Sequence, residues 1–176
     1  MIASLPDEVH KLPDVLAPNL RVVFVGTAAG RRSAEAGAYY AHPGNRFWRT
    51  LHEVGLTPRL YQPHEFPAML DLGIGFTDMS KVASGQDHEI EDHHFDVPRF
   101  NTVIRRHNPR VVAFTSKRAA SVWLAMPTGR IKLGRQETRP PGFPEVFVLP
   151  SPSGAAGATW TIAPWRDLAA WIRTSG

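Results

Sequence analysis

The sequence predicts an α/β fold, a three-layer sandwich with a central, mostly parallel four-stranded sheet between helices. Four short apolar segments, each ending in turn or small residues, are typical of strands buried on both faces of such a sheet. They lie at 21–25, 74–77, 111–114 and 146–149. Helical patterns separate these segments, and this alternation favours parallel strands joined by helices.

Apolar residues at helical spacing predict the helices. The first begins after Pro43 and Gly44, carries Phe47 and Leu51 on one face, and ends at Gly55. Further helices are expected at 63–72, 97–107, 117–125 and 164–173. The last carries an apolar stripe that we expect to pack in the core, formed by Trp165, Leu168, Ala169 and Ile172.

We expect a single domain over residues 1–176. At 176 residues and 43% hydrophobic, the chain can fill one core but is too short for two ordinary domains. Residues 1–19 contain three Pro and are expected to form a loosely packed lead-in with a short helix. The segment 127–144, rich in Pro, Gly and Arg, is expected to be one long loop.

Composition narrows the class of protein. The absence of Cys excludes a disulfide framework and a thiolate metal site. No secretory segment or long apolar span is visible, which favours a soluble cytoplasmic protein with no membrane contact. The net charge of +4 suits a polyanionic partner, although many proteins that bind nothing acidic have a similar charge. Several Arg lie beside the loops described next, but a general preference for Arg over Lys would place them there too.

The most informative segment joins a buried strand to a glycine-bounded loop. Val22–Gly26 is followed by Thr27–Gly30, then by Ser33, the pair Tyr39–Tyr40, and Gly44–Trp48 at the start of a helix. This order places backbone N–H groups and aromatic faces at the carboxyl edge of a parallel sheet. Open α/β folds bind their ligands at that edge.

Two more segments run from a strand into small or polar residues, at 72–79 and 146–156. Together the three segments resemble the mismatch-specific uracil (thymine) DNA glycosylases, a branch of the uracil-DNA glycosylase superfamily. The family motifs read G-x-N-P-G, Gly-x-Thr-Asn/Asp and x-P-S-G. The resemblance implies an enzyme that flips uracil in a G:U mismatch, or another damaged base, out of DNA and hydrolyses its N-glycosidic bond to leave an abasic site. It implies no cofactor and no metal, with DNA as partner of a monomer.

The chain departs from the first family motif at the residue that positions water. Ala28 stands where the family has Asn, and Ala29 replaces its Pro. Because a catalytic side chain at such a step contributes about two to four orders of magnitude in rate, either the activity is weak or another residue substitutes. We predict Asp87, in a polar loop, as the residue that activates water or stabilises the developing cation, and Asp78, at the Asn/Asp position of the family, as the second candidate. A solvated loop acid is the alternative for Asp87.

The resemblance also implies residues that hold the flipped base. Tyr40 matches the base-stacking position, its alternative being a core residue whose hydroxyl reaches the surface. The backbone that follows Gly26, with the amides of Thr27 and Ala28, is expected to donate to a base carbonyl. Tyr39 is compatible with either a site or a core role.

Three polar residues are expected to contact substrate, each with a structural alternative. Ser33 would read a base edge or a phosphate, or serve as an ordinary turn or cap residue. Asn45 would bond the pocket loop or cap the first helix. Ser151 would contact the base or the flanking phosphate.

The third motif implies a loop that inserts into DNA. Pro152, Ser153 and Gly154 would shape it, with Ser153 on phosphate. Relatives often carry a bulkier wedge after the Gly, whereas this chain has Ala155 and Ala156. A small wedge holds an opened duplex less firmly, which favours mismatched, weakly paired or single-stranded substrates.

Two alternatives belong to other functional classes. The run 87–94 is dense in Asp, Glu and His and would suit a metal-dependent hydrolase, although its near-contiguous spacing is more typical of a solvated loop. A protein that binds damaged DNA without chemistry is the other alternative, because the motif Asn is absent. No Lys is placed for Schiff-base chemistry, so the enzyme hypothesis is a monofunctional glycosylase.

Overall fold

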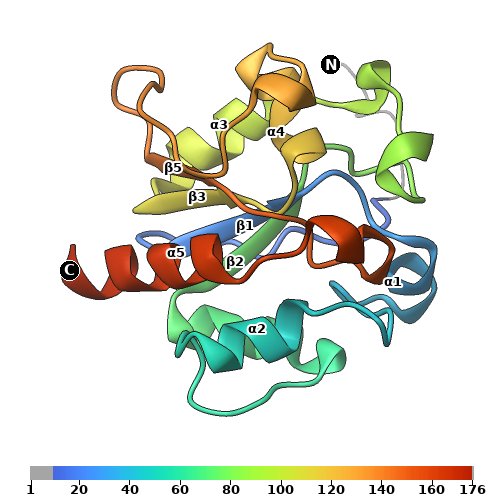
Figure 1. Cartoon of the computed structure of the whole chain (residues 1–176), viewed down its shortest axis with the longest axis vertical. Helices are drawn as coiled ribbons and strands as arrows, with labels where there is room; N and C mark the ends of the chain where they lie inside the picture. The colour runs from blue at the N-terminus through green and yellow to red at the C-terminus, as the bar shows by residue number, and fades with distance from the viewer. Residues whose placement is uncertain (1–9, 176) are drawn as a thin grey trace, which may run out of the picture.

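The computed structural model describes residues 10–175, and its centre is a sheet with the strand order β2-β1-β3-β5-β4 (Figure 1). The strands β1, β2, β3 and β5 run parallel, and β4 is antiparallel to β5. Their bounds are β1 (Val22–Gly26), β2 (Ile74–Asp78), β3 (Val111–Phe114), β4 (Gly134–Arg135) and β5 (Glu145–Val148). The four expected strands are confirmed, and the sheet has a fifth.

The fifth strand corrects the expectation that 127–144 is one long loop. Gly134 pairs with Val148 and Arg135 with Phe147, which makes β4 a short antiparallel edge strand. A strand of two residues is too short to show the alternation from which strands are predicted.

Helices connect the strands in the described part of the chain. The α-helices are α1 (Arg31–Ala36), α2 (Phe47–Glu53), α3 (Val97–His107), α4 (Lys117–Leu124) and α5 (Ala163–Thr174). The 3₁₀ segments are η1 (Pro63–Leu72), η2 (Asp87–Glu89), η3 (Asp92–His94), η4 (Thr128–Arg130) and η5 (Gly154–Thr159). The expected segment 63–72 is thus helical but of the tighter 3₁₀ type, with Pro67 inside it removing one backbone donor.

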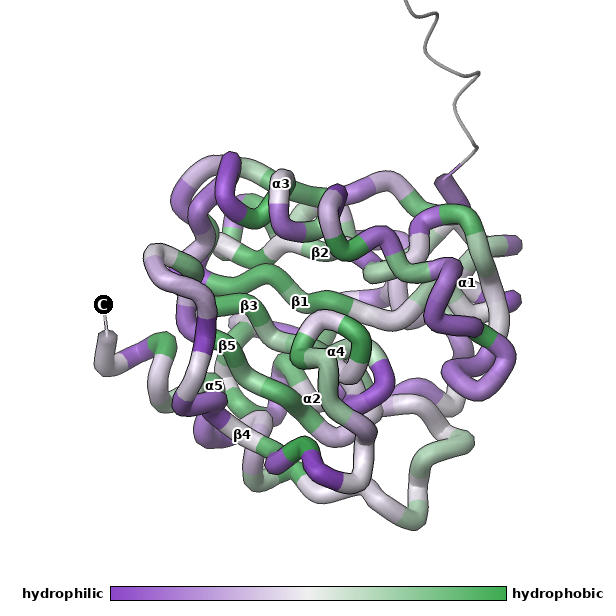
Figure 2. Tube along the Cα trace, turned by 90° about the horizontal axis from the view of Figure 1, so that it is seen from above, coloured by the Kyte–Doolittle hydropathy of each residue, from purple (hydrophilic) through white to green (hydrophobic). Residues whose placement is uncertain are grey.

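The helices form a layer on each face of the sheet, with α3 and α4 on one side and α2 and α5 on the other (Figure 1). Alternate residues of β1 point to opposite faces, as strand geometry requires. Phe24 packs toward α2 and α5, where its ring stacks at 5.8 Å on Trp165. Val23 packs toward α3 with Phe100. Viewed from above, the parallel strands are the hydrophobic centre of the molecule (Figure 2).

The lead-in packs more firmly than expected. Residues 10–19 form no helix, and Leu12 is buried at 1% exposure. Val15 exchanges two backbone hydrogen bonds with Phe76, each 2.9 Å long. Because β2 is an edge strand, these bonds pair backbone groups that would otherwise be open to another chain. The expectation of loose packing is therefore wrong for residues 10–19, and residues 1–9 lie outside the described part.

Across residues 10–175, none of the helices has the length and apolar character needed to span a membrane.

Candidate functional site

A cavity of about 800 Å³ lies at the carboxyl edge of the sheet. Four parallel strands end at this edge, so the loops that follow them meet there. The cavity brings together every residue that the sequence predicted for a site: Gly26, Thr27, Ala28, Ser33, Tyr40, Asn45, Asp78, Asp87, Ser151, Pro152, Ser153, Gly154, Ala155 and Ala156.

Gly26 and Asp78 form the floor of the cavity. They are partners in the register of β1 and β2. A Cβ atom on Gly26 would lie 2.5 Å from Asp78 Oδ1 and 3.5 Å from the Tyr40 hydroxyl. The glycine therefore makes room for a carboxyl group beside the tyrosine hydroxyl. Burial raises the pKa of Asp78 to about 6, although Lys81 acts in the opposite direction.

Tyr40 forms an aromatic wall and is partly exposed. Its ring stacks on Phe47 with centroids 4.0 Å apart, and its hydroxyl is 3.0 Å from Thr115 Oγ1. Burial and the Asp78 charge raise the pKa of Tyr40, so its hydroxyl is neutral at physiological pH. Tyr39 also lines the cavity, but it is 2% exposed and packed in the core, and its hydroxyl donates to the Pro13 carbonyl at 2.8 Å.

Two hydroxyl residues of the cavity were missed by sequence reasoning. Thr115 and Ser116 follow β3 directly and line the cavity from the middle of the sheet. Ser116 Oγ lies 3.4 Å from Thr27 Oγ1 and accepts a hydrogen bond from the Ala119 amide at the start of α4. Their position after a buried parallel strand was the available signal.

Ser33, Asn45 and Ser151 each support the local backbone as well as lining the cavity. Ser33 Oγ accepts from the Ala41 amide at 3.0 Å, and Asn45 Oδ1 accepts from the Phe47 amide at 2.9 Å. Ser151 Oγ accepts a hydrogen bond from the Ser153 amide at 3.2 Å. Ser33 lies inside α1 and does not cap it, and Asn45 bonds the first residue of α2 from one position before the N-cap, Arg46. Each of the three side chains retains a donor that a ligand can use.

Arg46 fixes the third motif against the start of α2. Its backbone amide donates to the Pro152 carbonyl at 2.8 Å, and its Nη1 donates to the Ser153 carbonyl at 3.2 Å. Its guanidinium lies 5.5 Å from the ring centroid of Trp160. The loop beyond this anchor is open to solvent, with Ala155 exposed.

Asp87 lies at the rim of the cavity, exposed on η2. Asp87 and Tyr40 line the same cavity, and the charge of Asp87 contributes to the raised pKa of Tyr40, after burial and Asp78. The loop that follows β1 holds this segment, because the Gly85 amide donates to the Ala29 carbonyl at 3.0 Å. Asp78 and Asp87 therefore face one cavity, from the floor and from the rim.

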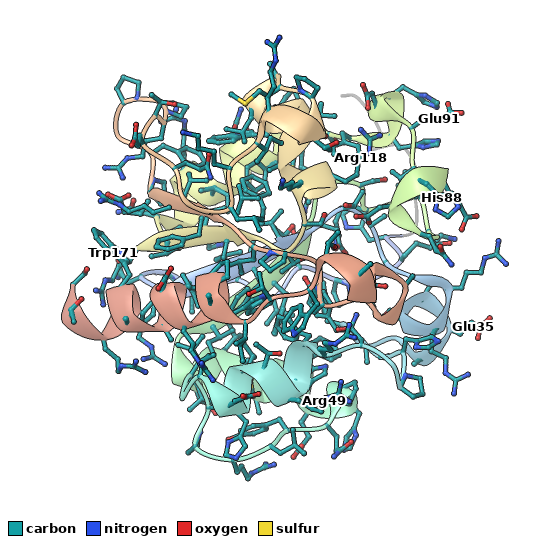
Figure 3. All side chains as sticks on the ribbon, in the orientation of Figure 1. Glu35, Arg49, His88, Glu91, Arg118 and Trp171 are labelled. Atoms are coloured by element: carbon teal, nitrogen blue, oxygen red, sulfur yellow. The ribbon has the colours of Figure 1, made fainter. Side chains whose placement is uncertain are left out.

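His88 and Glu89 line the rim of the cavity beside Asp87, whereas Glu91 and Asp92 do not line it. His88 and Glu91 lie on the outer edge of the molecule, and Arg118 of α4 lies behind them (Figure 3). Arg118 donates to the Ile90 carbonyl at 2.6 Å and pairs with Asp92 at 2.7 Å. Throughout the described residues, no three His, Asp or Glu side chains are grouped so that they could hold a metal ion. The geometry gives the metal-dependent alternative no support.

Comparison with known proteins identifies the relatives of this chain. The model of the uracil DNA glycosylase superfamily matches residues 13–171. A solution NMR structure of a candidate uracil DNA glycosylase from Methanosarcina acetivorans is similar, with a TM-score of 0.63 and 22% sequence identity. That match covers 92% of this chain and 94% of the other. At this identity, the structural similarity shows a shared fold.

Proposed function

We propose that this chain, which belongs to the uracil DNA glycosylase superfamily, hydrolyses the N-glycosidic bond of a uracil flipped out of DNA and leaves an abasic site. The observation that carries the proposal is the single cavity in which all three sequence motifs meet. Its volume of about 800 Å³ is ample for one nucleotide.

The cavity supplies what a flipped base needs. Tyr40 offers a flat wall whose tilt is fixed by stacking on Phe47. The Asp78 carboxyl, the Tyr40 hydroxyl and the Thr115 hydroxyl lie together at the floor, where the edge of the base would be read by hydrogen bonds.

Asp87 is our candidate for the group that orients water or stabilises the positive charge that develops on the sugar. Ala28 presents only a methyl group to the cavity. Asp87 enters the same space from the rim, where the sugar of a base seated on the floor would lie. A carboxylate at that place stabilises an oxocarbenium-like transition state by its charge.

The proposed product is an intact abasic site. Lys81 is the lysine of this region, and its side chain is 2% exposed behind Asp78. Among residues 10–175, no lysine lines the cavity, so no amine is in place to attack the sugar. This arrangement supports a monofunctional glycosylase.

The substrate preference that we propose is uracil opposite guanine, or in a single strand, over uracil opposite adenine. Ala155 and Ala156 occupy the insertion loop, and Ala155 is exposed. Two methyl groups fill little of the space that a flipped base leaves in the stack. DNA from which the uracil can be flipped out at a lower cost in free energy is therefore the favoured substrate.

Binding of damaged DNA without excision is the second candidate, and the methyl group of Ala28 at the water-positioning place favours it. The test is single-turnover cleavage of labelled oligonucleotides with uracil opposite guanine, opposite adenine and in a single strand, with a chelator present. Abasic product formed fastest from the first or third substrate supports the proposal. Tight binding without product would replace it with the binding function, and loss of activity on chelation would favour a metal enzyme.

A further inference from the structure

Lys81 is buried beside the cavity, although the proposed hydrolysis does not use it. It follows β2 by three positions, and its side chain is 2% exposed. Lysine is almost never buried to this degree unless its charge is paired. The oxygen atoms around its ammonium group therefore indicate the role of Lys81.

The Lys81 ammonium has three oxygen partners. Its Nζ lies 3.0 Å from the Tyr39 hydroxyl, 3.2 Å from Asp14 Oδ1 and 3.7 Å from Asp78 Oδ2. Because the Tyr39 hydroxyl donates its hydrogen bond to the Pro13 carbonyl, it accepts a hydrogen bond from the Lys81 ammonium group. Lys81 thus lies between a carboxylate of the lead-in and the carboxyl group of the cavity floor.

Asp14 is itself anchored from behind. It pairs with Arg99 of α3 and accepts a 2.6 Å hydrogen bond from the Thr77 hydroxyl. Burial raises the pKa of Asp14, but Lys81, Thr77 and Arg99 together hold it below its ordinary value. Asp14 therefore stays ionised and competes with Asp78 for the charge of Lys81.

The two oxygens of Asp78 have different surroundings. Oδ2 faces Lys81, whereas Oδ1 lies against Gly26, beside the Tyr40 hydroxyl and on the cavity side. Lys81 therefore holds Oδ2 as an ion pair at 3.7 Å, and Oδ1 retains capacity to bond a ligand.

We propose that Lys81 is a positioning residue of the cavity: it holds Asp78 by Oδ2, so that Oδ1 meets the flipped base, and it couples the charge of that carboxyl group to Asp14 and Arg99. The inference rests on the proposed function, because it names what reads the base. It extends that function by naming Lys81 as the residue that sets the position and charge of the Asp78 carboxyl group, which contacts the base.

The protonation state of Asp78 decides which base edge the floor accepts. When Asp78 is neutral and carries its proton on Oδ1, that hydroxyl group can donate to uracil O4 and accept from N3–H. The ionised form offers acceptors only and repels O4. Uracil binding should therefore weaken as the pH rises through the pKa of Asp78, about 6.

Charged and titratable groups reach Asp78 from four directions. Lys81 comes from its own segment, Asp14 from the lead-in, Arg99 from α3, and Tyr39 and Tyr40 from the segment before α2. The charge of Asp87 also raises the pKa of Tyr40. After burial itself, Lys81 is the largest influence on the pKa of Asp78, which it lowers, whereas Asp14 raises it.

Two substitutions therefore move the Asp78 titration in opposite directions. Lys81→Met removes the stabilising cation, and we expect the Asp78 titration to rise by roughly one to three pH units. Asp14→Asn removes an anion that competes for Lys81, so that Lys81 pairs with Asp78 alone. The pH at which Asp78 titrates should therefore fall. A role limited to holding the fold together would not reverse sign between the two variants.

The experiment follows the carboxyl ¹³C signals of the aspartates by NMR as the pH is varied, with Asp78→Asn identifying the Asp78 signal. In parallel, fluorescence anisotropy measures the affinity for an oligonucleotide containing 2′-fluoro-2′-deoxyuridine, an analogue that resists cleavage. We expect the pH midpoint of binding to move with the Asp78 signal in each variant, and Asp78→Asn to bind without this pH dependence.

The outcomes separate the inference from the proposed function. An Asp78 titration that stays in place in Lys81→Met, or moves the same way in both variants, overturns the coupling. If Lys81→Met does not fold, Asp14→Asn still decides, because an unchanged or raised titration contradicts the proposal. Coupling seen by NMR without binding of the uracil analogue would instead count against the proposed function, and with it against Asp78 as the reader of the base.

Discussion

Gly26 and Asp78 are register partners on β1 and β2, and the carboxyl oxygen of Asp78 occupies the space where a side chain on residue 26 would begin. The absence of a side chain on one strand thus sets the position of a functional group on the next. The carboxyl group could not stay beside the Tyr40 hydroxyl if residue 26 carried a Cβ, because 2.5 Å is less than any normal contact to carbon.

Gly26→Ala is therefore expected to displace Asp78 and to lower uracil excision strongly. Overpacking at a buried site also costs about 1–3 kcal/mol of unfolding free energy. Gly129→Ala is the matched control, because a Cβ there meets no atom within 4 Å. Urea unfolding and single-turnover excision check both effects. Unchanged excision in a folded Gly26→Ala protein would show that the Asp78 position is unimportant.

Two substitutions of Tyr40 distinguish the contribution of its ring, by stacking, from that of its hydroxyl, by hydrogen bonding. Tyr40→Phe keeps the ring on Phe47 and loses the 3.0 Å contact with Thr115, so we expect a loss of affinity for uracil-containing DNA of about tenfold or less. Tyr40→Ala loses the wall, at about 1–3 kcal/mol of base stacking. Tyr61→Ala, a tyrosine covered by Arg59, is the control. Equal losses in Tyr40→Phe and Tyr40→Ala would contradict a stacking role.

Arg46 should matter for DNA binding through the loop that it anchors. Arg46→Ala removes the hydrogen bond to the Ser153 carbonyl and the cation–π contact with Trp160. We expect weaker binding to abasic and uracil-containing DNA, with little change for Arg49→Ala, an exposed arginine on α2 (Figure 3). Anisotropy titrations at equal salt compare the two. A similar loss in both variants would indicate a general charge effect.

The raised pKa of Asp78 also predicts how stability depends on pH. Folding shifts this group from an ordinary value of 3.8 to about 6, so the folded state binds its proton more tightly than the unfolded state. The stabilising contribution is complete at low pH and is lost as the pH rises through about 6. Between low pH and a pH well above 6, this difference in pKa lowers the free energy of unfolding by roughly 3 kcal/mol.

Asp78→Asn should remove this dependence. Urea unfolding of wild type and variant across the same pH range gives the comparison, and the variant should gain stability relative to wild type as the pH increases. A constant difference across the range would show that Asp78 does not titrate with a raised pKa.

The sequence predicts the parallel strands well because each is an apolar run closed by turn residues, as in 111–114. It also places the cavity residues together, since residues that follow parallel strands share one edge of the sheet. The helices of the sandwich could be predicted for a related reason: Trp165 and Leu168 of the apolar stripe are 0% exposed, as their helical spacing indicated.

The missed features depend on contacts between distant residues. The pairing of Val15 with Phe76 turns a Pro-containing lead-in into an edge cover, and no local pattern indicates it. The ion cluster behind the cavity joins Asp14, Lys81 and Arg99, which come from three separate segments. A single charged residue in a sequence is expected to be solvated, and only the fold shows that Lys81 is buried between partly buried Asp14 and Arg99.

The most direct test of the account is the single-turnover excision rate of Asp87→Ala on uracil opposite guanine, measured beside Glu91→Ala, which changes an acid on the outer side of the same run (Figure 3). If Asp87 orients water or stabilises the sugar cation, its loss should slow excision by about two to four orders of magnitude, with DNA binding retained and Glu91→Ala unaffected. A rate equal to that of wild type in the Asp87 variant would contradict the account and require another group in the cavity to perform the chemistry.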